Sequence, residues 1–373
     1  MSEVVEINRV EDLDAHHLLW RSLLGRTANG SFFQSLDWLK AYWRHFGSGQ
    51  KLRVLVVYSG GRAIGIMPLT VIAERTRLGR FKVLTYPLQN WGSLYGPIGP
   101  HPAATLAAAL RHVRQSPRDW DILDLRWTDK DGADRGRTLT AMQIVGFKPR
   151  ECVWEQLGVI DMTGSWDEYL ASRTAKLRSD VRRQLRRIEA SGRVEYVRHR
   201  PLGAVHGDGD PRWDLYDACV EVARRSWQAS STNGTTLSHE KVSDFFRATH
   251  ELAAKAGALD LNLVKLDGQP IAFAYNYYHE GCVSGLRMGY DPEFSHFGPG
   301  RVLYAHTIRD SFERDDHTYD LGPGSLQIKS SWLTRIAKSY RYLHYPPASP
   351  RVQLVRMKRW MTGLTGAETG AGV

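Results

Sequence analysis

The chain carries the same order of elements twice, and this internal repeat constrains its fold more than any single motif does. Each copy has a helical segment, a β-hairpin, a loop of Gly and Pro, a second helical segment and a strand that contains Asp-Leu. The hairpins are predicted at 52–58 with 63–72 and at 261–266 with 270–278, because apolar runs flank Gly-containing turns. We therefore predict two copies of one α/β unit.

The other members of the two copies occupy corresponding places. They are the preceding helix, the loop and the Asp-Leu strand: 36–46, Gly96-Pro97-Ile98-Gly99-Pro100 and Asp124-Leu125 in the first copy, and 240–256, Gly298-Pro299-Gly300 and Asp320-Leu321 in the second. A length of 373 residues suits two domains of ordinary size. We place a first unit at 1–160, a second at 161–348, and a basic C-terminal segment at 349–373 that we expect to fray from Thr365 onward.

Composition excludes several classes of protein. With 42% hydrophobic residues and 12 Trp, the chain is predicted to be packed rather than disordered. No apolar run approaches the roughly 20 residues that span a bilayer, and Met1–Trp20 lacks the pattern of a signal peptide. Cys152, Cys219 and Cys282 form no CxxC pair, which indicates a reducing compartment, the cytoplasm by default. The HExxH and P-loop patterns are absent, and we expect no metal.

Part of the net charge of +10 lies in one predicted helix, 165–192. Ser165 with Glu168 forms a capping box at its start, and Gly192 is a plausible stop. Its basic residues are Arg173, Lys176, Arg178, Arg182, Arg183, Arg186 and Arg187. Two interpretations stay open: a solvated helix packed on the second unit, or a cationic wall for an acidic substrate, a nucleotide-linked precursor or an RNA.

A second basic stretch lies near the C-terminus, at Arg351, Arg356, Lys358 and Arg359. Basic surfaces attract anionic partners. A peripheral contact of the protein with anionic surfaces is therefore among the partners that we expect.

The second Gly/Pro loop has the properties of an anion-binding loop. An apolar run through Arg287, Gly289 and Tyr290 leads to Ser295-His296-Phe297-Gly298-Pro299-Gly300-Arg301, which opens a helical stretch. Glycines let the backbone approach a ligand closely, and unpaired N–H groups of a first helical turn point at an anion. His296 and Arg301 could add charge-assisted contacts. An ordinary turn is the alternative interpretation.

These residues resemble the core of the GNAT acyltransferase fold, whose loop pattern is Gln/Arg-x-x-Gly-x-Gly/Ala. Gly298 and Gly300 match this pattern, and Ser295 departs from it. The duplicated layout, the basic helix, Ser226-Trp227 and Tyr319-Asp320-Leu321-Gly322…Lys329…Trp332 resemble a narrower group: tandem GNAT-like proteins related to the Fem peptidoglycan aminoacyltransferases and to acetyltransferase-like proteins of bacterial polysaccharide clusters. The resemblance implies an α/β chain of α+β type, with two units that each contain a mixed, mostly antiparallel sheet flanked by helices.

The resemblance further implies acyl transfer from acyl-CoA, acetyl-CoA above all, to an amine or hydroxyl of a cell-envelope sugar or a related metabolite precursor. In such folds the strand before the loop, here 286–292, splays from its neighbour, and the pantetheine of the donor lies in the gap. The residues expected to bind the donor are Met288, Gly289, His296, Phe297, Gly298, Gly300 and Arg301. Prolines in the first loop remove N–H groups that could bind an anion. We therefore place the acyl donor in the second unit and expect the first unit to shape the substrate site.

The general base is not selected by any motif. Asp320, His296, His306 and Tyr290 are all candidates, and Asp320 is our first choice because it ends a strand beside the predicted cleft. Asp320 could equally cap the turn Gly322-Pro323-Gly324. Lys329 is a candidate to neutralise phosphate or to stabilise the oxyanion, or else a surface lysine.

Aromatic and basic side chains are the candidates for binding the acceptor. Trp227, Arg287 and Trp332 are the residues that we expect in this role, although an aromatic at helical spacing is core at least as often.

Two other functions stay open. One is a Fem-like transferase that uses aminoacyl-tRNA, which the basic helix favours. The other is a non-catalytic protein that keeps the fold and binds an anionic polymer.

Overall fold

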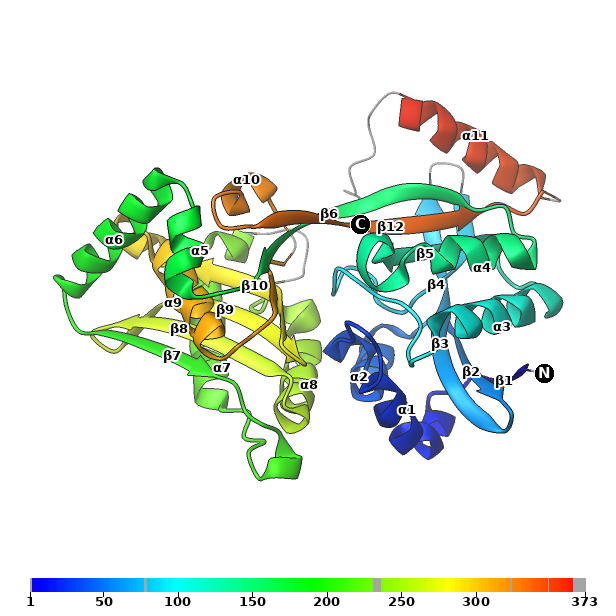
Figure 1. Cartoon of the computed structure of the whole chain (residues 1–373), viewed down its shortest axis with the longest axis horizontal. Helices are drawn as coiled ribbons and strands as arrows, with labels where there is room; N and C mark the ends of the chain where they lie inside the picture. The colour runs from blue at the N-terminus through cyan, green and yellow to red at the C-terminus, as the bar shows by residue number, and fades with distance from the viewer. Residues whose placement is uncertain (1, 77–78, 231–235, 323, 348, 365–373) are drawn as a thin grey trace. The chain divides into compact units, whose positions relative to one another are not determined.

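The structure is a computed structural model that describes residues 2–76, 79–230, 236–322, 324–347 and 349–364. The chain forms two compact units, the first made of residues 1–156 and 337–373 and the second of residues 157–336. The chain enters the second unit within strand β6 (Arg150–Asp161) and returns within β12 (Arg335–His344) (Figure 1). Residues 337–348, which the sequence-based division placed in the second unit, therefore lie with the first.

The first unit is built on a sheet in the order β1-β2-β3-β4-β5-β12. Its neighbours are antiparallel except for β4 and β5, which are parallel. The bounds of its elements are β1 Ser2–Ile7, α1 His17–Leu24, α2 Leu36–Phe46, β2 Lys51–Ser59, β3 Arg62–Thr76, β4 Gly79–Thr85, α3 Pro102–Gln115, β5 Ile122–Thr128, α4 Arg137–Val145 and α11 Pro350–Leu364.

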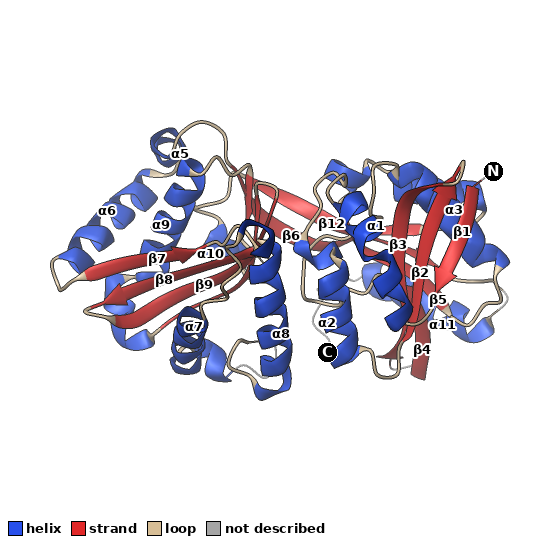
Figure 2. Cartoon of the chain, turned by 90° about the horizontal axis from the view of Figure 1, so that it is seen from below, coloured by secondary structure: helices blue, strands red, loops and turns tan. Residues whose placement is uncertain are grey.

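The second unit is built on a sheet in the order β6-β11-β10-β9-β8-β7, in which β10 and β11 are the parallel pair. The bounds of its elements are α5 Trp166–Ser172, α6 Ala175–Glu189, β7 Val194–His199, α7 Trp213–Arg225, α8 Glu240–Ala256, β8 Leu259–Leu266, β9 Gln269–His279, β10 Cys282–Tyr290, α9 Pro299–Glu313, β11 Thr318–Asp320 and α10 Leu326–Lys329. Figure 2 shows these helices on the two faces of the sheet.

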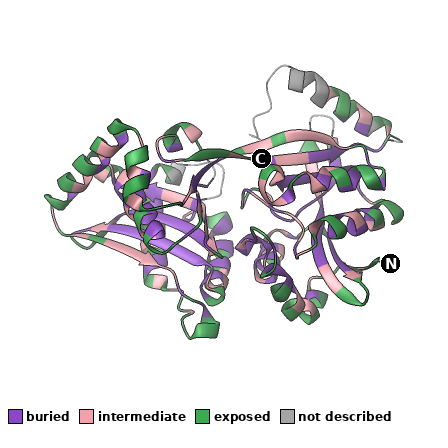
Figure 3. Cartoon of the chain, viewed as in Figure 1, coloured by how far each residue is buried: buried purple, intermediate pink, exposed green. Residues whose placement is uncertain are grey.

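Alternate residues of β9 divide the core of the second unit between the two faces of its sheet. Ala272 and Ala274 pack with Val302 and Leu303 of α9. Tyr275 faces the other way, with its ring 6.2 Å from that of Tyr216 on α7 and 6.0 Å from that of Phe246 on α8. The period-2 alternation of a strand thus explains why helices cover both faces and why these strands are buried (Figure 3).

The predicted fold class is confirmed: the chain is a mixed α/β protein with largely antiparallel sheets flanked by helices. The helices predicted at 36–46 and 240–256 have those bounds, and both predicted hairpins form. Among the described helices, none contains an apolar stretch long enough to cross a membrane. Pro323 and the tail from Thr365 onward lie outside the described residues.

The single basic helix predicted at 165–192 is wrong. Its start is as predicted, since Ser165 and Glu168 form the capping box. However, α5 ends at Ser172, and the Thr174 hydroxyl accepts a hydrogen bond from the Leu177 N–H at 3.2 Å to cap a new helix, α6. A Thr side chain that satisfies a first-turn N–H favours a helix start at that point over a continuous helix.

Candidate active site

The parallel strands β10 and β11 stay paired over three residues and then part. Their register joins Cys282, Val283 and Ser284 to residues 318–320, whereas β10 remains paired with β9 up to Tyr290. The register of β10 with β9 also shifts between Gly285 and Arg287. A bulge bends a strand and increases its twist, so the bulge lies where β10 leaves β11.

Two glycines allow the backbones to touch at this point. A Cβ atom on Gly285 would lie 2.8 Å from the Asp320 carbonyl oxygen and 3.0 Å from the Leu321 carbonyl carbon. Gly322 has a left-handed φ of +77°, and a Cβ on it would overlap the Gly285 carbonyl group. Any side chain at either position would push β10 from the turn that ends β11.

The turn after β11 brings together Asp320 and Lys329, two of the predicted catalytic residues. Asp320 Oδ1 accepts a hydrogen bond from the Gly322 N–H at 2.8 Å. The Lys329 amino group, from α10, is buried and donates to the Gly322 carbonyl oxygen. Asp320 therefore does cap the turn, and Lys329 is not a surface lysine. Their roles in proton transfer and oxyanion stabilisation stay predictions.

The predicted phosphate loop leads into α9 with Gly298 as its N-cap, in a left-handed conformation with φ +66°. The Gly298 N–H donates to the Ser295 carbonyl oxygen at 2.9 Å, Pro299 has no N–H, and the Arg301 N–H donates to the Gly298 oxygen at 2.9 Å. Of the three first-turn positions 299–301, the contacts among described residues thus leave the Gly300 N–H for a ligand.

Helix α6 lies against this loop. A Cβ on Gly298 would overlap the Gln184 side-chain amide, and Arg187 Nη1 donates to the His296 carbonyl oxygen at 3.0 Å. His296 itself is exposed. Arg301 lies 3.8 Å from the Asp180 carboxylate of α6. Side chains of α6 therefore occupy part of the space in front of the loop.

Consecutive residues of β10 point to opposite faces of the sheet. A Cβ on Gly300 would lie 3.3 Å from Met288 Cε and 3.4 Å from Tyr290 Cδ1, so both side chains lie under the start of α9. Tyr290 and Phe297 also pack against a core cluster of buried apolar residues. These contacts give both rings a packing role beside any catalytic or binding one.

Arg287 and Gly289 face α7 and α8 instead. The Arg287 guanidinium lies 5.8 Å from the centre of the Phe246 ring, and a Cβ on Gly289 would lie 3.3 Å from Ser226 Oγ. Burial lowers the pKa of Arg287 to about 10. That Arg287 binds the acceptor stays a prediction, and its position on the face of β10 toward α7 and α8 is compatible with it.

The two predicted acceptor tryptophans have different surroundings. Trp332 is buried, its carbonyl oxygen accepts the Tyr169 hydroxyl, and its ring packs 5.8 Å from Tyr304 in the core. Trp227 is 65% exposed and directly follows Ser226 at the end of α7. Packing accounts for Trp332, whereas Trp227 is accessible to a ligand.

His306, the second histidine among the candidates for the base, lies away from the parting strands. Its ring stacks on Tyr196 of β7, the edge strand of this unit, which β9 and β8 separate from β10. Burial lowers the pKa of His306 to about 4, so the imidazole is neutral near pH 7.

Comparison with known proteins identifies the family to which the fold of the second unit belongs. Residues 175–330 match the profile of the acetyltransferase (GNAT) domain. The second unit is a GNAT domain. No curated protein sequence matches the chain.

Solved structures show the same fold over nearly the whole chain. The crystal structure of FemX has a TM-score of 0.61 at 15% identity and covers 95% of this chain and 99% of its own. The C-terminal domain of a putative lysylphosphatidylglycerol synthetase from Agrobacterium fabrum has a TM-score of 0.52 at 11% identity, with 95% and 97% covered. At these identities the likeness shows a shared fold.

The first unit repeats the strand order of the GNAT domain, but backbone N–H groups of its Gly/Pro loop are hydrogen-bonded within the unit. Its parallel strands β4 and β5 pair through two residues, Val83 with Ile122 and Leu84 with Leu123. In the loop that follows, Ile98 and Ile66 exchange two backbone hydrogen bonds of 2.8 Å. The Gly99 N–H donates to the Thr27 hydroxyl at 2.8 Å. Because these N–H groups are used and Pro97 and Pro100 have none, the loop of the first unit has fewer donors for an anion.

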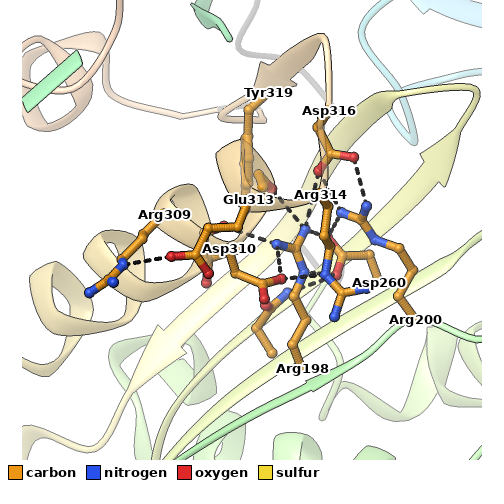
Figure 4. Close-up of polar contacts among 12 residues, drawn as sticks. Arg198, Arg200, Asp260, Arg309, Asp310, Glu313, Arg314, Asp316 and Tyr319 are labelled. Carbon is orange, nitrogen blue, oxygen red and sulfur yellow. Dashed lines mark hydrogen bonds and ion pairs between the residues drawn. The ribbon is translucent and has the colours of Figure 1, made fainter. Parts of the chain in front are cut away.

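The GNAT domain also contains a buried ion cluster that sequence reasoning missed (Figure 4). Arg198 on β7 bonds the fully buried Asp260 carboxylate of β8 at 2.8 Å and Asp310 of α9 at 2.7 Å, while Arg200 bonds Asp316 at 2.7 Å. Burial alone would raise the pKa of Asp260, but the guanidiniums of Arg198 and Arg200 hold it well below its usual range. Two arginines at alternate positions, Arg198 in β7 and Arg200 directly after it, were the signal in the sequence. The cluster ties β7, β8 and α9 together and has a structural role.

Proposed function

We propose that this protein transfers an acyl group from acyl-CoA, acetyl-CoA in the first instance, to an amine or hydroxyl of a cell-envelope sugar or a related metabolite precursor. The observation that supports this most is the early parting of β10 from β11, which leaves β10 paired with β9 alone beyond Ser284. A pantetheine arm lying along this edge would bring its thioester to the backbone of residues 288–290. A preorganised N–H at that place stabilises the oxyanion of a tetrahedral intermediate by about 2.7–4 kcal/mol.

The residues at the turn after β11 would complete the reaction. The acceptor nitrogen or oxygen attacks the thioester carbonyl carbon, its proton passes to a base, and the C–S bond breaks to release the thiolate. We assign the base to Asp320, which the turn holds at the end of the gap, and charge stabilisation to Lys329. General base catalysis of this kind contributes roughly 10²–10⁴-fold to the rate.

We place the reaction in the bacterial cytoplasm. Cys152, Cys219 and Cys282 are all free thiols, which suits a reducing compartment.

Calorimetric titration with acetyl-CoA and with free CoA tests the donor. We expect binding with 1:1 stoichiometry and its loss in Gly300→Val, whose side chain would press on Met288 and Tyr290 beneath the loop. Gly96→Val is the matched control, because a Cβ there meets no atom within 4 Å. Wild-type protein that binds neither ligand would contradict the proposal.

An aminoacyl-tRNA donor is the second candidate, and the charge of α6 favours it. This helix carries six basic and two acidic side chains within 15 residues. RNA binding with a steep salt dependence and no CoA binding would select this donor. Binding of an anionic polymer without any turnover would instead select the non-catalytic alternative.

A further inference from the structure

We infer that the arginine row of α6 binds the phosphate groups of the acyl donor, a nucleotide-type molecule with several phosphates. This inference rests on the proposed function, since it takes the donor to lie in the GNAT domain. It assigns the anion site mainly to side chains of α6 and not to the backbone of the loop before α9.

The arginine row lines an open, shallow groove along one face of α6. The groove has a volume of 780 Å³ and is lined by Ala175, Arg178, Ser179, Arg182, Arg183, Arg186 and Arg187. These positions follow the spacing of three and four residues that places side chains on one face of a helix. From Arg178 to Arg187 the row extends about 14 Å along the helix axis, at 1.5 Å per residue. This length suits a pyrophosphate together with a further phosphate better than a single anion.

The charge of the row is only partly neutralised within the described residues. Asp180 pairs with Arg183 at 2.6 Å and lies 3.8 Å from Arg301. Arg182 and Arg186 are exposed, and the ion pairs of the described residues join neither to a carboxylate. Because a planar guanidinium matches the oxygens of a phosphate with two parallel hydrogen bonds, these two arginines are the best placed to bind one.

The loop before α9 has few backbone N–H groups that could bind the phosphates in place of α6. Gly298 and Arg301 use their N–H groups within the loop, Pro299 has none, and the Gln184 amide fills the space at Gly298. Yet the row and the loop are adjacent, since Arg187 donates to the His296 carbonyl oxygen at 3.0 Å. A donor with its phosphates on α6 would thus pass the start of α9 on its way to β10.

The test compares ligands with and without phosphates. Acetyl-CoA, inorganic tripolyphosphate and acetyl-pantetheine are titrated into the wild type, into Arg182→Ala/Arg186→Ala, and into Arg309→Ala. The last is the matched control, an exposed arginine on α9 that pairs with Glu313 at 2.8 Å. Circular dichroism and thermal unfolding verify that each variant is folded.

We expect the double variant to bind acetyl-CoA and tripolyphosphate at least 10-fold more weakly and acetyl-pantetheine as before. The loss of two charge-assisted hydrogen bonds is sufficient for this change in affinity. The control variant should keep all three affinities. Equal binding of acetyl-CoA by wild type and double variant would overturn the inference and leave the proposed function intact.

Two further outcomes of these titrations separate the phosphate site from the identity of the donor. If tripolyphosphate binding depends on Arg182 and Arg186 but acetyl-CoA does not bind, the phosphate site stands and the proposed acyl-CoA donor fails. If the row instead binds a transfer RNA more tightly than acetyl-CoA, the assignment to a nucleotide-sized donor is overturned.

Discussion

The backbone amide of Gly322 lies within hydrogen-bond distance, 2.8 Å, of Asp320 Oδ1, while the carbonyl oxygen of the same glycine accepts the buried Lys329 amino group. One residue thus bonds two of the predicted catalytic side chains, at the point where β11 leaves β10. Because a turn with both polar groups bonded is rigid, Asp320 and Lys329 keep a fixed position relative to the gap between the strands.

Asp320→Asn is expected to lower turnover at least 100-fold with little effect on stability. An amide oxygen can still accept the Gly322 N–H, so the turn persists, but it cannot take a proton at neutral pH. Asp320→Ala is the matched comparison, because it also loses the turn bond and should cost roughly 1–2 kcal/mol in the free energy of unfolding. Steady-state kinetics and denaturant unfolding measure both effects. Full activity of Asp320→Asn would remove Asp320 from the reaction.

Lys329→Met should destabilise the second unit by roughly 1–3 kcal/mol. Methionine keeps the apolar stem but leaves the Gly322 carbonyl oxygen without the bond that Lys329 donates. Turnover should fall further than this loss of stability explains, if the ammonium group stabilises the oxyanion. Activity measured well below the melting temperature separates the two effects, and unchanged kcat/KM would assign Lys329 to structure alone.

Gly285→Ala is expected to destabilise the chain by more than 1 kcal/mol and to reduce acyl transfer. The new Cβ would lie 2.8 Å from the Asp320 carbonyl oxygen, so β10 or the turn must move. Gly96→Ala is the control, since a Cβ there has open space. Thermal unfolding of the two variants side by side makes the comparison, and equal melting temperatures would argue against the tight contact.

Asp260→Asn should cost about 3–5 kcal/mol of stability without acting on the chemistry. It leaves the guanidiniums of Arg198 and Arg200, each 7% exposed, without their shared buried carboxylate. Asp217→Asn, which breaks an exposed pair with Arg247 at 3.5 Å, should cost no more than about 1 kcal/mol. Denaturant unfolding at neutral pH measures both, and similar losses would show that the buried cluster contributes little.

Acid should destabilise the second unit partly through His250, whose pKa burial lowers to about 4. The unfolded chain takes up this proton near pH 6.5 and the native chain only near pH 4, so stability is present above pH 6.5 and is lost as the pH falls toward 4. Between pH 7.5 and 5 the loss from this group is about 2 kcal/mol at 1.36 kcal/mol per pH unit. His250→Gln should flatten the pH dependence of the unfolding free energy, and exposed His206→Gln should not. Parallel pH profiles for wild type and His250→Gln would contradict this.

Local signals in the sequence predicted the regular elements well. The hairpin turns place Gly60 and Gly61, and Asp267 and Gly268, at positive φ, which is the conformation that Gly-rich two-residue turns favour. The helix predicted at 36–46 forms with those bounds, and the Ser35 hydroxyl caps it by accepting the Trp38 N–H at 3.1 Å. These signals depend on a few neighbouring residues and therefore survive without knowledge of the fold.

The site was harder to predict, because it depends on which side chains the fold brings together. The pattern Tyr319-Asp320-Leu321-Gly322…Lys329…Trp332 pointed to the turn that holds Asp320 and Lys329. It did not predict that Trp332 is buried. Nor did the sequence predict the pairing of Arg198 with Asp260, which are 62 residues apart. The Gln184 amide over Gly298 was equally hidden, since it depends on where α6 packs.

By itself the sequence determined the duplicated order of elements, their periodicity and the turns between them, because these follow from backbone preferences and alternating burial along the chain. Only the tertiary structure decided that the chain returns to the first unit at residue 337, so that β12 pairs with β5. It also decided that α6 lies in front of the loop. The physical reason is the same in each case: packing and strand pairing between distant segments select one arrangement among several that the local sequence permits.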